Sequence, residues 1–363
     1  MHDIKIIANK TSPLCYLNDG RLVCYCQGRI ILYKNDRINI SFPLFVSKKE
    51  KVLGWSRMAT RFFRFGVRYA LALDSTHVLL SIGNHLREFN IETGEQSQGW
   101  NCGEGTRPLT LTKVEGIDGF DNGVYYGEYK GVLDKNPISV YRRKDIDKWV
   151  EVYRFNEGEV DHIHNIVPDP YRKCLWIFSG DFGNAAAIWK VSDNFKQVEK
   201  IAYNNQCYRG CVAFALQEGL LYATDAPFTE NYIYKLNPET LELKKIIPIH
   251  GSCIYGSKIE NDYAFSSTVE GNEFRNKKEF FFSRKRGDGI KDDYVHLYLG
   301  NLKEGFKEIY KEKKDCLPLY SFQFGVFKFP SGINGSEDLY MQSVATITND
   351  QKLLKVCRTD KQQ

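Results

Sequence analysis

HNIVPDPYRKCLWIFSGD, residues 164–181, is the stretch that decides the fold. An apolar segment leads into a tight polar turn at Asp169-Pro170, and a second apolar segment of similar length follows. This pattern is typical of a β-hairpin. Similar hairpins recur along the chain, in PLCYLNDGRLVCYC from Pro13, YALALDSTHVLLSIG from Tyr69, VAFALQEGLLYATD from Val212 and YGSKIENDYAFSST from Tyr255.

Each hairpin is followed by two amphipathic strands, so the repeating unit has four strands and a period of about 40–50 residues. This periodicity predicts an all-β, seven-bladed β-propeller that forms a single domain over residues 1–363. We expect blades at about 12–43, 66–101, 107–155, 161–203, 208–249, 250–310 and 321–357. The last unit has only three strands of its own, and we expect residues 3–7 to supply its outer strand, which would leave no open edge at the chain ends.

The bulk composition excludes several classes of protein. The net charge is only +5, with 50 basic and 45 acidic residues mixed along the chain, so a general nucleic-acid binder is not indicated. No stretch approaches the roughly 20 apolar residues of a transmembrane helix, and the N-terminus lacks the pattern of a signal peptide. The ten scattered cysteines read as reduced, mostly buried thiols. We therefore expect a cytoplasmic protein.

Two segments interrupt the repeat, at 44–65 and 271–292. The first contains Arg57, Arg61 and Arg64, and Arg68 follows it. These arginines are spaced four, three and four residues apart, so in a helix they would share one face. One interpretation is a peripheral contact of Arg57, Arg61 and Arg64 with an anionic polymer or membrane surface. The other is a crossover loop with solvated arginines. The second segment is a basic rim loop or a lid over a ligand.

In a propeller, the loops that enter the innermost strands and the loops that follow the second strands open on the same face. Polar residues at these positions should therefore converge at one mouth of the central channel. The starts of the innermost strands contribute Arg68, Arg107, His162, His164, Tyr208, Arg209, His250 and Gln323. The ends of the second strands contribute Glu128, Asp181, Asp225 and Glu270.

His162 and His164 are two residues apart, which places both side chains on one face of a strand. With Asp181 they offer a ligand set for a divalent metal. They could equally act as acid and base, since histidine titrates near neutral pH. The third alternative is a pair of hydrogen-bonded histidines that holds the next loop.

Arginines from three different blades, Arg68, Arg107 and Arg209, point toward the expected mouth. A charge in a partly enclosed channel needs a partner, or it costs several kcal/mol. Either the nearby carboxylates pair with these guanidinium groups, or the groups bind an anionic ligand such as a carboxylate in bidentate fashion. Tyrosines such as Tyr129 add the flat, amphipathic surface that suits sugars.

Three resemblances follow from these residues. The run from Ser179 to Asn184 with Ile188-Trp189 resembles the Asp-box of the sialidase superfamily, although the second serine or threonine of that box is missing. The set of His162, His164, Arg209 and Tyr208 resembles that of propeller-type polysaccharide lyases of the ulvan and oligogalacturonate kind. Blades 3 to 7 are similar to uncharacterised propellers of bacterial surface-polysaccharide gene clusters in the runs GEVDHIHNIVPDPY, LLYATDAPFTENYIYKL and SFQFGVFKFP.

The resemblances imply a carbohydrate-active protein that binds an acidic oligosaccharide or polysaccharide, uronate-like or sialate-like, at the channel mouth. In a lyase, an arginine or metal would neutralise the uronate carboxylate, His162 or His164 would remove the proton, and Tyr208 would donate one. A glycoside hydrolase would instead use two of the carboxylates at the ends of the second strands. The third alternative is a non-catalytic scaffold that presents one face to a protein or glycan.

Overall fold

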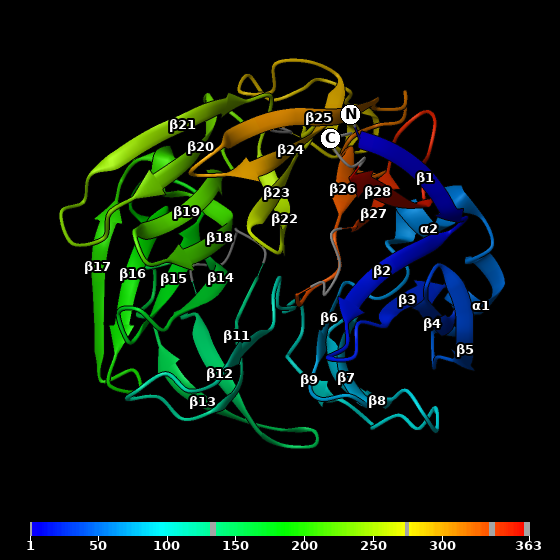
Figure 1. Ribbon diagram of the computed structural model, residues 1–363, viewed down its shortest axis with the longest axis horizontal. Helices are drawn as coiled ribbons and strands as arrows, with labels where there is room; N and C mark the ends of the chain where they lie inside the picture. The colour runs from blue at the N-terminus through cyan, green and yellow to red at the C-terminus, as the bar shows by residue number, and fades with distance from the viewer. Residues whose placement is uncertain (1, 131–135, 273–275, 334–337, 359–363) are drawn as a thin grey trace, which may run out of the picture.

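The chain folds into seven four-stranded antiparallel sheets arranged in a ring (Figure 1). The computed structural model describes residues 2–130, 136–272, 276–333 and 338–358. In six blades the strands follow one another in sequence from the centre outward, for example β14-β15-β16-β17 in blade 4. The predicted seven-bladed propeller is therefore confirmed.

Each of the seven blades contains four strands. Blade 1 contains β2 (Thr11–Tyr16), β3 (Leu22–Cys26), β4 (Arg29–Lys34) and β5 (Arg37–Pro43), and blade 2 contains β6 (Tyr69–Ala72), β7 (His77–Ile82), β8 (His85–Asn90) and β9 (Trp100–Asn101). Blade 3 contains β10 (Thr112–Val114), β11 (Gly123–Gly127), β12 (Ser139–Asp145) and β13 (Lys148–Arg154), and blade 4 contains β14 (His162–Asp169), β15 (Cys174–Gly180), β16 (Ala187–Ser192) and β17 (Gln197–Tyr203). Blade 5 contains β18 (Gly210–Leu216), β19 (Gly219–Thr224), β20 (Asn231–Leu236) and β21 (Leu243–Ile249), and blade 6 contains β22 (Cys253–Ile259), β23 (Asp262–Ser267), β24 (Tyr294–Asn301) and β25 (Gly305–Lys313). Blade 7 contains β26 (Val326–Lys328), β27 (Leu339–Val344), β28 (Leu353–Arg358) and β1 (His2–Ala8).

The two ends of the chain close the ring in blade 7. Strand β1 pairs antiparallel with β28, with Ile4 opposite Val356 and Ile6 opposite Leu354. Figure 1 shows the N and C labels next to each other beside these strands. The prediction that the N-terminal strand supplies the outer edge of the last blade is confirmed, and the pairing satisfies backbone groups that would otherwise form an open edge.

The core lies between the blades. Strand residues alternate between the two faces of each sheet, and both faces meet a neighbouring blade. Between blades 4 and 5, for example, Trp176 and Phe178 of β15 pack with Tyr222 of β19 and Tyr234 of β20. Burial of each such side chain contributes about 1.5–3 kcal/mol. The innermost strands are thereby held with their ends at the channel mouth.

The first insertion forms two short helices, α1 (Lys48–Leu53) and α2 (Arg57–Phe63), between blades 1 and 2. Ser56 caps α2 by accepting a hydrogen bond from the amide of Ala59, and Arg64 ends it in the left-handed conformation. The expectation that Arg61 faces an anionic surface is wrong, because its side chain is fully buried and paired with Asp315 and Asp350.

The remaining arginines of the expected helical face separate after α2. Because the helix ends at Phe63, Arg64 and Arg68 lie beyond it and do not continue its face. Arg57 remains half exposed and pairs with Asp350 at 3.3 Å. The arginines therefore do not form a single solvent-facing row.

The second insertion forms α3 (Lys277–Phe282) between β23 and β24 of blade 6. Its Phe281 ring stacks on Phe62 of α2 with 6.4 Å between the ring centroids. The two segments that interrupt the repeat are thus in contact. Within the residues that the structure describes, the helices have only six or seven residues, and none could cross a bilayer.

Candidate functional site

Two histidines of the innermost strand of blade 4 meet a carboxylate near the channel. His162 and His164 of β14 are buried, and their Nε2 atoms are 2.9 Å apart. Asp181, which follows β15, places its Oδ1 atom 3.1 Å from Nε2 of His162 and 3.2 Å from Nε2 of His164. The three atoms form a nearly equilateral triangle, so the structure brings together the three residues that the sequence suggested as a ligand or acid–base group.

A glycine makes this arrangement sterically feasible. Gly180 is the last residue of β15, and a Cβ atom built there would lie 2.2 Å from Cε1 of His164. The imidazole therefore lies against bare backbone, which only glycine offers. Packing of the His164 ring therefore explains why a glycine stands between Ser179 and Asp181.

The distances within this triangle fit a divalent cation, but the surroundings fit it less well. Four ligands at about 2.0–2.1 Å from Zn²⁺ stand roughly 3.3 Å apart, close to the observed separations. Metal-bound histidines usually donate their other ring N–H to a carboxylate or carbonyl. Among the described residues, Nδ1 of His162 and Nδ1 of His164 have no such partner. This favours an acid–base role over metal binding for the pair.

Arg209 links this triangle to blade 5. Its Nη2 lies 3.0 Å from Oδ1 of Asp181 and 3.3 Å from Oδ2 of Asp225, and the Sγ–H of Cys211 donates to the same Asp225 oxygen at 3.3 Å. Burial alone would raise the pKa of Asp181, but the charge of Arg209 and the contacts with the two histidines hold that pKa well below its usual value. Burial lowers the pKa of His164, so its imidazole is neutral near pH 7. Arg209 is thus a positioning residue held between two carboxylates.

Glu270 completes the group of buried carboxylates. It lies at the edge of the same cavity as Asp181, Arg209 and Asp225. Burial, followed by the negative charge of Asp225, raises the pKa of Glu270 to about 8. This carboxyl group is therefore mostly protonated at neutral pH and can donate a proton.

Above these groups, the channel mouth holds a cavity of about 500 Å³. Arg64, Arg68 and Arg107 line it, and among the described residues none of the three has a carboxylate partner. Partial burial, and then the positive charge of Arg68, lower the pKa of Arg64 and of Arg107. The three cations therefore lie close enough to repel one another. Such a cluster of unpaired guanidinium groups suits an anion. A second cavity of about 360 Å³ extends from it down the channel, sharing Arg68 and His164.

Tyr129, rather than Tyr208, is the tyrosine that lies beside the two histidines at the mouth. Its ring lies 4.1 Å from that of His162 and 6.3 Å from that of His164, between centroids, and the guanidinium carbon of Arg68 lies 5.8 Å from its centroid. Burial and then the charge of Asp181 raise the pKa of Tyr129, so the phenol keeps its proton. Tyr208 instead belongs to a 3₁₀ turn (Gln206–Tyr208) and packs with Tyr222 and its neighbours between blades 4 and 5. Tyr208 is not among the described residues that line the mouth.

Two further predicted mouth residues lie elsewhere. Glu128 accepts a hydrogen bond from the amide of Ser139 at 2.9 Å and pairs with Lys130. Neighbouring side chains of an extended chain point to opposite sides, so Glu128 points away from the channel when Tyr129 points toward it. His250 contacts the hydroxyl of Tyr298 and stacks on His296 at 4.0 Å between centroids. Those partners belong to β24, the third strand of blade 6, which lies away from the channel.

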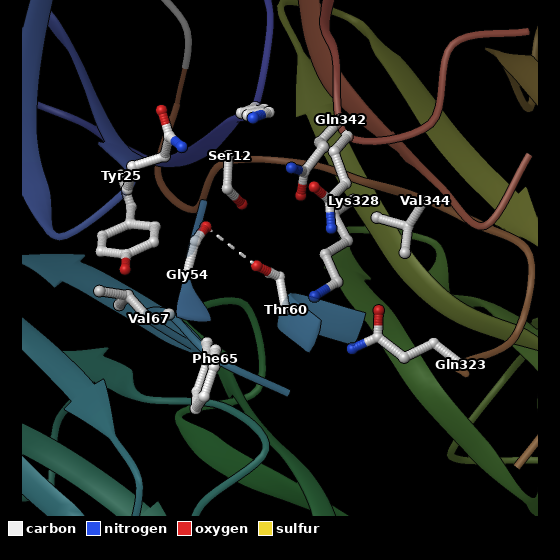
Figure 2. A pocket seen from close by; sticks show the side chains of 14 residues that line it. Ser12, Tyr25, Gly54, Thr60, Phe65, Val67, Gln323, Lys328, Gln342 and Val344 are labelled. Atoms are coloured by element: carbon white, nitrogen blue, oxygen red, sulfur yellow. Dashed lines mark hydrogen bonds between the residues drawn. The ribbon is translucent and has the colours of Figure 1, made fainter. Parts of the chain in front are cut away.

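Gln323 does line the mouth, and it also borders a smaller pocket. Figure 2 shows this pocket, where Gln323 and Lys328 approach Thr60 and Gln342, with Tyr25 and Val67 on the other side. Its volume of about 60 Å³ has room for one or two water molecules, whose share of liquid volume is about 30 Å³ each. The larger mouth cavity is therefore the place for a saccharide-sized ligand.

Sequence reasoning missed several residues of the mouth. The sequence pattern favours a surface contact for Arg64 and does not select Lys328 or Cys211, although all three residues line the mouth. The sequence indicates Tyr129 only as a flat surface for a sugar. Tyr129 and Cys211 could have been found from the sequence, since they lie one residue after Glu128 and two residues after Arg209. Those two positions are selected because the starts of the innermost strands and the ends of the second strands reach the mouth.

The comparisons with known proteins concern the fold. No protein-family model and no curated protein sequence matches the chain. The extracellular domain of BT4673 from B. thetaiotaomicron superposes on 100% of this chain with a TM-score of 0.55 at 10% identity, and the match covers 40% of that chain. The β-propeller domain of Cps50 (Swd1) from Myceliophteria thermophila gives a TM-score of 0.56 at 8% identity, covering 98% of this chain and 100% of that one. The WD40 repeats of RRP9 give 0.55 at 9% identity, covering 98% and 97%.

The likeness is one of fold. At such low identity, a shared propeller carries no shared activity. The resemblance to carbohydrate-active families thus stays a hypothesis, and the function has to be argued from the mouth itself.

Proposed function

We propose that the mouth cavity binds an acidic saccharide. The observation that carries this proposal is the cluster of Arg64, Arg68 and Arg107, three guanidinium groups around one cavity without a carboxylate partner among the described residues. A uronate or sialate carboxylate would supply the missing negative charge in bidentate geometry. Tyr129 offers its ring as a flat surface for the sugar.

We further propose that the bound uronate undergoes β-elimination. Burial lowers the pKa of His164, so its imidazole is neutral, and the residue lines the mouth cavity. A neutral imidazole at the cavity wall can act as the general base of the reaction. Arginines beside the carboxylate stabilise the charge that develops when the α-proton leaves.

The proposed β-elimination uses two protein groups, one that accepts a proton and one that donates a proton. His164 takes the proton from C5 of the uronate, the C4–O bond breaks as the C4–C5 double bond forms, and the phenol of Tyr129 donates a proton to the leaving oxygen. The 6.3 Å between the two ring centroids allows both residues to reach one sugar ring. Arg209 and Asp181 hold His164 in place and do not touch the reacting atoms in this scheme.

The test is to incubate the full chain with a panel of uronate-containing oligosaccharides and to follow the ultraviolet absorbance of an unsaturated uronate. Tyr129→Phe should lower turnover by about 10²–10⁴-fold, the usual contribution of a general acid, while saccharide affinity changes little. Tyr208→Phe is the matched control, because that tyrosine packs between blades 4 and 5. Equal activity of the two variants would refute the assignment to Tyr129.

A glycoside hydrolase is the second candidate, and the protonated state of Glu270 favours it. A carboxyl with a pKa of about 8 in the same cavity as a second carboxyl group, Asp225, matches the pair of carboxyl groups that such enzymes use. New reducing ends without new absorbance would select this mechanism. Calorimetric binding of an acidic saccharide without any cleavage would indicate a non-catalytic binding propeller.

A further inference from the structure

The two insertions meet on the mouth face and build one exposed aromatic surface. One is the connection from β5 to β6, the other the connection from β23 to β24, and both kinds of connection open on the same face of a propeller. Phe62 and Phe63 of α2 lie 5.0 Å apart between centroids, and Phe62 stacks on Phe281 of α3. With the adjacent Phe282, these four side chains form what we call the aromatic platform.

Among the residues that the structure describes, the platform remains partly exposed to solvent. Phe62, Phe63 and Phe281 are each about 40% exposed, and Phe282 is 71% exposed. Val52 of α1 and Trp55 between α1 and α2 are also largely exposed. Monomeric proteins rarely leave contiguous apolar surface in water without a use for it. A partner is therefore expected to cover this surface.

The positive charge of the chain is concentrated in the same two segments. Residues 44–65 and 271–292 contain 13 Lys or Arg and 5 Asp or Glu, a net charge of +8, while the whole chain carries +5. The rest of the sequence is thus net negative, at −3. Exposed lysines lie on α1 and α3 near the platform, at Lys48, Lys49, Lys51, Lys277 and Lys278.

We propose that the aromatic platform docks onto an anionic lipid bilayer. Phenylalanine and tryptophan side chains enter the headgroup region, and lysines around them are attracted by anionic lipids. A protein partner fits less well, because lysine is depleted from protein–protein interfaces. Here Nζ of Lys49 lies only 3.5 Å from the centroid of Phe63, within the aromatic surface itself. Lipid headgroups accept such a mixture of lysine and aromatic rings.

Docking of the platform would also orient the channel. Phe65 lines the mouth cavity and lies 5.3 Å from the Phe63 ring, and Phe280 lines the same cavity and lies 5.2 Å from the Phe281 ring. The mouth therefore opens directly beside the platform. A protein attached in this way presents its cavity to the membrane surface, whatever ligand the cavity binds.

The experiment is cosedimentation of the full chain with phosphatidylcholine vesicles that contain or lack phosphatidylglycerol, at low and high salt. We expect binding only to the anionic vesicles, with weaker binding at high salt. The double change Lys277→Glu and Lys278→Glu should lower the partition coefficient by roughly 30-fold or more. Phe282→Ser should lower it by roughly 10-fold, since one largely exposed ring is lost.

Matched controls come from the opposite face of the propeller. Tyr171, 58% exposed in the turn between β14 and β15, gives the control Tyr171→Ser. Lys303 and Lys307, exposed at the β24–β25 hairpin, give the control Lys303→Glu with Lys307→Glu. The control variants should bind as the unmodified chain does.

Three results would overturn the proposal. The first is no binding to anionic vesicles. The second is equal loss of binding in the platform variants and in the controls. The third is a dimer on size-exclusion chromatography that Phe282→Ser dissociates, since a second copy of the chain would then cover the platform.

Discussion

Replacement of Arg61 by methionine should destabilise the protein far more than its place in a surface insertion suggests. The side chain is fully buried, its Nη1 contacts Asp315 and lies 3.3 Å from Oδ2 of Asp350, and its Nε donates to the carbonyl of Phe322 at 2.8 Å. Arg61→Met would leave two carboxylates in a buried site with one cation fewer. Removal of one partner from a buried ion pair costs about 3–5 kcal/mol.

A matched control exists one helical turn away. Arg57 pairs with the same Asp350, also at 3.3 Å, but its side chain is 52% exposed. Exposed pairs contribute about 0–1 kcal/mol, because water screens the charges. Arg57→Met therefore removes the same kind of contact from the same carboxylate and should cost about 1 kcal/mol or less.

The assay is urea unfolding of both variants, followed by tryptophan fluorescence, together with amide hydrogen exchange of α2. The midpoint should fall clearly for Arg61→Met and little for Arg57→Met. Exchange in α2 should accelerate first, since Arg61 ties this helix to the connections at Asp315, Phe322 and Asp350. If the two variants differ by less than about 1 kcal/mol, the burial argument is refuted.

Two further predictions concern the buried groups of the mouth. A chelator should leave saccharide binding and turnover unchanged, because the histidine Nδ1 atoms have, among the described residues, none of the partners that metal ligands usually have. Activity lost with chelator and restored by a divalent cation would instead assign His162, His164 and Asp181 to a metal. Glu270 should contribute a fall in the free energy of unfolding of about 1.4 kcal/mol per pH unit between about pH 4.5 and 8, because its folded carboxyl keeps the proton up to a pKa of about 8 while the unfolded carboxyl loses it near 4.5. The lowered pKa values of His164 and His250 oppose this decline below about pH 6.5. Glu270→Gln should flatten this decline in urea midpoints, and an unchanged slope would show that the carboxyl is not its source.

The propeller was predictable because every blade has the same packing requirement. Every blade must bury both faces against its neighbours, so each unit carries the same alternation of apolar residues and the same turns. The missing strand of the seventh unit was predictable for the same reason, since only β1 remained to pair with β28.

The site was predictable only in part. The loop rule selects which chain positions reach the mouth, and it brought His164, Asp181, Arg209, Asp225 and Glu270 to one cavity. It does not say which way a side chain turns beyond the end of a strand. The 3₁₀ turn at Gln206–Tyr208 directs Tyr208 into a blade interface, and the residue after Glu128 takes the channel side instead. Local backbone geometry decides these outcomes.

The burial of Arg61 could not be read from its helical spacing. The spacing of the arginines was compatible with a helix or with a crossover loop, and the two carboxylates that neutralise Arg61 follow more than 250 residues later. A sequence pattern shows which face a residue occupies, while the fold decides what that face meets. A charged residue in an insertion is therefore a weak indicator of a solvent-exposed surface.

The two insertions that interrupt the repeat also make one side of the channel mouth different from the others. The strands are constrained by packing in every blade, whereas connections at the ends of the ring are free to vary. In this chain the two most divergent connections lie on one face, touch each other through Phe62 and Phe281, and contribute Arg64 and Phe280 to the mouth cavity. A seven-fold frame would otherwise offer similar surroundings on every side of its channel. The insertions give the mouth one basic, aromatic side, and this side distinguishes the surroundings of the cavity that His164 lines.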